Sequence, residues 1–86
     1  MYRLAAILIL LPLASVAAKD KGGDFEACKR GRTEVARKAS DYQGEERIKR
    51  LIQADLRRAA EEEAEGDSDE CLEALDHAKK LIAGQY

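Results

Sequence analysis

The apolar positions between residues 24 and 86 recur at intervals of three and four, which is the period of an α-helix rather than of a β-strand. They fall into three amphipathic segments that are separated by short polar turns containing glycine. Short turns favour antiparallel neighbours. The pattern therefore predicts an all-α fold: a small three-helix up-down-up bundle, made of a helical hairpin and an N-terminal helix.

The first predicted helix begins near Asp24 and ends at about Ser40 or Asp41. Gly31 weakens this helix by up to about 1 kcal/mol relative to alanine, and Arg32 interrupts its apolar stripe. Gly44 tolerates a left-handed turn, so we expect the helix to break there, with Ser40 or Asp41 as candidate caps. A continuous helix across Gly44 is the alternative. The stripe consists of Phe25, Cys28, Val35, Ala39 and Tyr42.

The second predicted helix runs from about Glu45 to Glu65, and the negative charges at its start suit the helix dipole. Its apolar stripe is Ile48, Ile52, Leu56 and Ala59, widened by Leu51 and Ala60. The opposite face carries charged residues, among them Lys49, Arg50, Arg57 and Glu61.

The third predicted helix runs from about Ser68 to Ala83. Gly66 is expected to end the preceding helix, while Asp67 and Glu70 form a pair like a capping box. Gly84 ends the third helix. Its buried side is predicted to consist of Cys71, Leu72, Leu75, Ala78 and Ile82.

Residues 1–18 have the pattern of a cleaved secretory signal peptide. Arg3 precedes an apolar run, and small residues up to Ala17 and Ala18 offer cleavage after either alanine. An uncleaved anchor is the alternative, but the run is shorter than the roughly 20 residues that a spanning helix needs. We therefore expect an exported protein, in the periplasm or outside the cell, with composition favouring the bacterial periplasm. Residues 19–23 would form a flexible leader and residues 24–86 a single small helical domain.

The chain has a formal net charge of −2. Removal of Arg3 with the signal peptide would make it more acidic. Nucleic-acid binding relies on a basic surface, so the composition argues against a nucleic-acid partner.

Cys28 and Cys71 are the chain's two cysteines. In an exported protein such a pair predicts a disulfide, and the up-down-up topology places both cysteines at the same end of the bundle. Closure of this loop would stabilise the fold by about 4 kcal/mol in the chain-entropy model. Two free thiols or a redox role are the alternatives. With one histidine in the chain we expect neither a metal site nor a cofactor.

Residues 52–82 resemble a single tetratricopeptide-type helical hairpin. Gly66 stands at the family's turn, Cys71 and Ala59 at its small positions, and Leu75 and Ala78 at the matching positions of its second helix. The chain departs from the pattern at Asp55 and Glu62, where the family prefers large apolar residues. The resemblance implies a tight helical hairpin and, by extension, a peptide-binding role.

An acidic run without a basic residue extends from Glu61 to Asp76. It is a candidate patch for a basic partner, centred on Glu61, Glu62, Glu65, Asp67, Asp69 and Glu70. The alternatives are a solvated helix surface and a weak Ca²⁺ site, although the calcium loop pattern is incomplete.

A basic segment precedes the acidic run and comprises Lys29, Arg30, Arg32, Arg37, Lys38, Arg47, Lys49, Arg50, Arg57 and Arg58. The topology brings its first residues to the acidic end, which favours charge pairing within the fold; contact with anionic lipid or an envelope polymer is the alternative. His77 has no evident nucleophile, so we interpret it as an exposed helical histidine.

These observations favour a non-catalytic, exported protein-binding or accessory module whose partner is a larger exported protein. A charged, envelope-associated structural protein is the alternative, and a thiol-redox protein is a third. No membrane span is expected after signal cleavage, and the sequence leaves the oligomeric state open.

Overall fold

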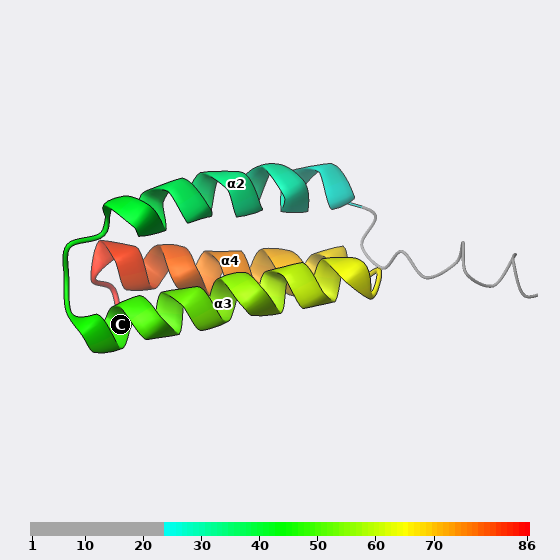
Figure 1. Cartoon of the computed structure of the whole chain (residues 1–86). Helices are drawn as coiled ribbons and strands as arrows, with labels where there is room; N and C mark the ends of the chain where they lie inside the picture. Colours follow the sequence, from blue (N-terminus) through cyan, green and yellow to red (C-terminus); the bar gives the residue numbers. More distant parts are fainter. Residues whose placement is uncertain (1–23) are drawn as a thin grey trace, which may run out of the picture.

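The computed structural model describes residues 24–86, which form three antiparallel helices. Helix α2 spans Phe25–Asp41, α3 spans Glu46–Ala64 and α4 spans Ser68–Ala83 (Figure 1). The predicted three-helix up-down-up bundle is confirmed, with every helix end within about one residue of its expected position. The expected signal peptide (1–18) and leader (19–23) lie outside the described residues.

The break between α2 and α3 occurs where the sequence predicts it, but for a different reason. Gly44 does not have a positive φ. A Cβ at Gly44 would instead overlap the ring of Tyr42, so glycine leaves room for that ring and does not serve a left-handed turn. The expected caps are also wrong, because α3 begins after Glu45 without a side-chain cap and the Ser40 hydroxyl donates to Arg37 O at 2.8 Å.

The turn between α3 and α4 is a Schellman motif followed directly by an N-cap. Gly66 has a φ of +83°, its amide donates to Glu63 O at 3.0 Å, and the Asp67 amide donates to Glu62 O at 2.8 Å. The Asp67 carboxylate then accepts from the Glu70 amide at 3.1 Å and caps α4. A full capping box would also have the Glu70 carboxylate accept from the Asp67 amide. Here the Asp67 amide donates to Glu62 O, and the Glu70 carboxylate accepts from Arg58.

The core lies where all three helices meet and contains several small side chains. Its buried apolar members are Cys28, Val35, Ile48, Ile52, Ala59, Cys71, Ala74, Leu75, Ala78 and Leu81. One predicted core position is corrected, because Leu51 is 41% exposed. At the end of α4 the predicted Ile82 is partly buried against the core, and Leu81, which was not predicted, is buried. The small residues allow the helix axes to approach closely.

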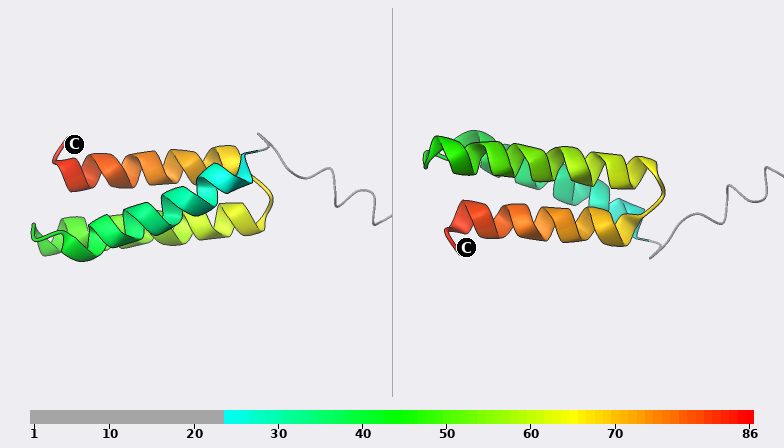
Figure 2. Two further views of the ribbon diagram at one scale, coloured as in Figure 1. Left: turned by 90° about the horizontal axis from the view of Figure 1, so that it is seen from above. Right: turned by 90° about the horizontal axis from the view of Figure 1, so that it is seen from below.

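Helix α2 crosses the α3–α4 pair at an angle (Figure 2). It begins beside the start of α4 and ends beside the start of α3. The crossing is close at Gly31, where a Cβ would lie 2.8 Å from Leu75 Cδ1. The glycine that weakens α2 as an isolated helix therefore makes room for a core leucine.

A disulfide joins Cys28 in the first turn of α2 to Cys71 in the first turn of α4, with the two Cα atoms 6.0 Å apart. Both cysteines are fully buried. At the same end, the Asp24 amide donates to Ser68 Oγ at 3.1 Å. The predicted crosslink is confirmed, and it fixes α2 to the hairpin where the two helices begin. None of the helices within residues 24–86 is long and apolar enough to cross a membrane.

Candidate functional site

The predicted acidic patch lies around the turn between α3 and α4, and part of its charge is neutralised within the fold. Arg58 on α3 donates to Glu70 at 2.6 Å and to Glu73 at 3.4 Å, and the hydrogen bond to Glu70 raises the pKa of the Arg58 guanidinium. Arg32 on α2 pairs with Glu63. These contacts bear out the charge complementarity expected between the basic segment and the acidic end.

Four carboxylates at this end form no ion pair with another residue of 24–86. Glu61, Glu65 and Asp69 are exposed, and Glu62 in the last turn of α3 is half-buried. Partial burial raises the pKa of Glu62, and the negative charges of Glu65, Asp67 and Glu70 raise it further against a smaller opposing effect of Arg58. Within residues 24–86, no group of three or more potential ligands is placed to hold a metal ion.

His77 has a partner that sequence reasoning missed. Its Nδ1 lies 2.6 Å from Oδ2 of Asp55 on α3, and Nδ1–H donates because a carboxylate only accepts. Asp55 is 9% exposed and follows Ile52 on the buried side of α3, whereas His77 is exposed. Asp55 is also the residue that departs from the tetratricopeptide pattern. The carboxylate at this buried position is compensated by a histidine reaching over from α4.

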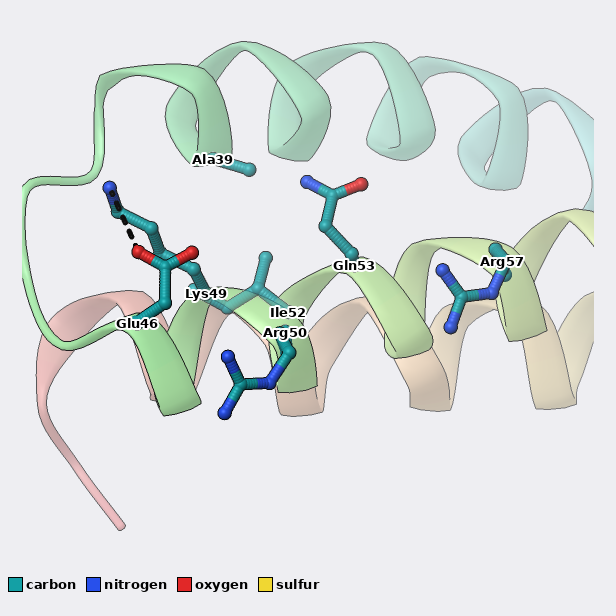
Figure 3. A pocket seen from close by; sticks show the side chains of 7 residues that line it. All are labelled: Ala39, Glu46, Lys49, Arg50, Ile52, Gln53 and Arg57. Atoms are coloured by element: carbon teal, nitrogen blue, oxygen red, sulfur yellow. Dashed lines mark ion pairs between the residues drawn. The ribbon is translucent and has the colours of Figure 1, made fainter.

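The junction between α2 and α3 contains an open cavity of about 410 Å³. Its apolar part comes from Ala39 on α2 and Ile52 on α3, and the remainder consists of polar and charged side chains of α3: Glu46, Lys49, Arg50, Gln53 and Arg57. Figure 3 shows Gln53 directed from α3 toward α2, with the guanidinium groups of Arg50 and Arg57 on either side of it along the helix. Residues 50 and 57 are two helical turns apart, which corresponds to about 10 Å between their backbone positions along the helix axis.

A second cavity, of about 510 Å³, lies along the same junction. Its lining includes Ala36 and Leu56, which are one turn from Ala39 and Ile52 respectively, so the two cavities follow one another along the helices. The rest of the lining is Lys29, Arg32, Thr33 and Glu63. We call the two cavities together the α2–α3 groove.

The α2–α3 groove carries an excess of positive charge on a protein that is acidic as a whole. Both of its carboxylates are used in ion pairs, Glu63 with Arg32 and Glu46 with Lys49 at 4.0 Å. Lys29, Arg50 and Arg57 form no ion pair with any residue in the described part of the chain. The groove is therefore suited to an anionic group.

Sequence reasoning located the charges of this groove but not the groove itself. It placed Lys49, Arg50 and Arg57 on the polar face of α3, and it did not predict that these side chains line a cavity together with Ala39 of α2. The sequence did contain an indication of this arrangement. In a three-helix bundle α3 contacts both α2 and α4, so some residues next to its apolar stripe must lie beside one of these helices.

No family model, curated protein or solved structure matches this chain.

Proposed function

We propose that this protein is an exported, non-catalytic binding module that attaches to a larger exported protein as an accessory subunit, inhibitor or adaptor. The observation that carries the proposal is the α2–α3 groove, which combines apolar surface from Ala39 and Leu56 with cations that have no ion-pair partner in residues 24–86. Surfaces that offer both kinds of contact are typical of protein-recognition sites.

Export is supported by the signal-like pattern of residues 1–18 and by the Cys28–Cys71 disulfide. Structural disulfides persist in oxidising compartments and are rare in the cytosol. A thiol-redox role is disfavoured because both sulfur-bearing residues are fully buried, which denies an attacking thiolate access to either sulfur.

The Asp55–His77 pair does not by itself support an enzyme. The carboxylate orients the imidazole as it would in a catalytic triad. However, no hydroxyl or thiol of the described residues is hydrogen-bonded to the imidazole. The pair instead contributes to the contact between α3 and α4.

The alternative function is attachment to an anionic polymer or lipid of the cell envelope, and the unpaired charges of Lys29, Arg50 and Arg57 favour it. The two functions differ in salt dependence. An interaction made by exposed charges weakens strongly at about 1 M salt, where the Debye length is about 3 Å, whereas a packed protein interface is screened much less.

The experiment is capture of partners from the exported fraction of the source organism by the full chain carrying a C-terminal affinity tag. We expect one protein in near-stoichiometric amount, retained after a high-salt wash. The same chain after reduction and alkylation of its cysteines is the control, and we expect it to lose the partner with the fold. Recovery of heterogeneous material that high salt removes, or sedimentation of the protein with envelope fragments, would contradict the proposal.

A further inference from the structure

We propose that the α2–α3 groove binds an acidic peptide segment that carries apolar side chains among its carboxylates; this inference rests on the proposed function and names the partner's chemistry. The groove offers two kinds of contact in fixed positions. The partly exposed Ala39 and Leu56 supply apolar surface between the helices, and Arg50 and Arg57 supply guanidinium groups beside it.

The charge of the groove selects an anion. Its two carboxylates are already paired with Lys49 and Arg32, so Arg50 and Arg57 hold positive charge that no described residue offsets. Guanidinium groups bind carboxylates through two parallel hydrogen bonds, which gives direction as well as attraction.

The apolar part of the groove selects a peptide over a polysaccharide or polyphosphate. An anionic polymer without apolar groups would leave the exposed parts of Ala39 and Leu56 without an apolar contact, whereas an apolar side chain of a peptide would cover them. Gln53 projects from α3 toward α2 (Figure 3), and its amide is able both to donate to and accept from a peptide backbone.

The acidic end of a second copy of this chain is the alternative carboxylate-rich occupant of the groove. Its free carboxylates, Glu61, Glu65 and Asp69, come from a helix end, a turn and a helix start, with no large apolar side chain among the exposed residues between them. That end offers charge without the apolar contact, so a separate peptide fits the groove better than a second copy.

The test uses two fluorescein-labelled peptides of equal length and charge on the full, disulfide-bonded chain. In one peptide leucines are interspersed among glutamates so that both kinds of side chain share a face, and in the other serines replace the leucines. We expect fluorescence anisotropy to show that the leucine peptide binds the unmodified protein about tenfold more tightly than the serine peptide does. The double variant Arg50→Gln/Arg57→Gln should bind the leucine peptide about tenfold more weakly than the unmodified protein does. Gln53→Glu, which adds a negative charge inside the groove, is expected to weaken binding in the same direction.

The matched control is Arg30→Gln/Lys79→Gln, which removes the same charge from exposed positions that also lack ion pairs within residues 24–86. We expect this variant to bind within about twofold of the unmodified protein, because its changes lie outside the groove. In amide NMR spectra the leucine peptide should shift the resonances of Ala39 and Gln53.

Several results would overturn the inference. If Arg50→Gln/Arg57→Gln and Arg30→Gln/Lys79→Gln bound the leucine peptide equally, the groove would not be its binding site. Equal affinity for the serine peptide or for alginate would indicate a surface that binds polyanions in general. Self-association abolished by Arg50→Gln/Arg57→Gln would make a second copy the occupant, and no peptide binding at all would also contradict the inference. If the Arg50→Gln/Arg57→Gln protein still captured the stoichiometric partner, the proposed function would stand and only this inference would fail.

Discussion

Glu62 holds its negative charge among other negative charges at the turn between α3 and α4. Partial burial and the neighbouring carboxylates raise its pKa in the folded state above the value expected in the unfolded chain. Its ionised form therefore opposes folding: the penalty is fully present above the folded pKa. It disappears as the pH falls from that pKa to the ordinary glutamate pKa.

We predict that Glu62→Gln stabilises the protein at neutral pH and low salt, and that the gain shrinks toward zero as the pH falls below the ordinary glutamate range. Urea denaturation at several pH values measures it. Glu61→Gln, which removes the same charge from the preceding exposed position, is the control and should have a smaller effect. A stabilisation by Glu62→Gln that does not change with pH would contradict this explanation.

The Asp55–His77 contact gives a second prediction at the scale of residues. Asp55 is nearly buried, so removal of its imidazole partner leaves a carboxylate with one hydrogen bond fewer. A double-mutant cycle of Asp55→Ala and His77→Ala, measured by urea denaturation, should give a coupling free energy of about 0.5–1.5 kcal/mol. Strictly additive effects would mean that the two side chains do not stabilise one another.

At the scale of helices, the crossing of α2 over α4 depends on Gly31. A larger side chain there must displace Leu75, and overpacking of this kind costs about 1–3 kcal/mol. We predict that Gly31→Leu lowers the free energy of unfolding by that amount. The change should be smaller for Gly31→Ala, because a gain in helix propensity of up to about 1 kcal/mol opposes the clash.

Ala54→Leu places the same side chain at an exposed position of α3 that lines neither cavity, and it serves as the control. It should alter the free energy of unfolding little, since exposed substitutions away from special features usually stay within about 0.5 kcal/mol. If Gly31→Leu were as mild as Ala54→Leu, the close crossing would not hold in solution.

The helices were predictable because their signals are local. The spacing of Ile48 and Ile52, the glycine at position 66 and the aspartate at position 67 each act within one or two turns, and the helix boundaries follow from them. The disulfide was predictable because topology alone places the starts of α2 and α4 at one end.

The remaining features depend on how the helices are rotated against one another, which the sequence pattern does not specify. Leu51 belongs to the apolar stripe by spacing, yet it faces solvent because α4 and α2 cover only part of α3. The role of Gly44 depends on the position of the Tyr42 ring. The α2–α3 groove arises only once Ala39 is set opposite Ile52 and Gln53, and so it could not be read from α3 alone.

At the scale of the whole molecule, stability depends on the disulfide because the core is small and built partly from alanine. The crosslink closes a loop between residues 43 positions apart. In the chain-entropy model it contributes about 4 kcal/mol, which is close to the lower end of the net stability of a domain, about 5 kcal/mol. We predict that reduction leaves most of the protein unfolded, as measured by loss of helical circular dichroism and restored by reoxidation. A reduced protein with unchanged helicity and cooperativity would contradict this.

The proposed function depends on export of the chain and on the bond between Cys28 and Cys71. The most direct test is the intact mass of the protein recovered from the exported fraction without reductant, compared with its mass after reduction and alkylation. We expect a chain beginning at Ala18 or Lys19, two hydrogens lighter than the dithiol form, with no thiol open to alkylation before reduction. A full-length chain with both Cys28 and Cys71 alkylated before reduction would contradict both the export and the crosslink.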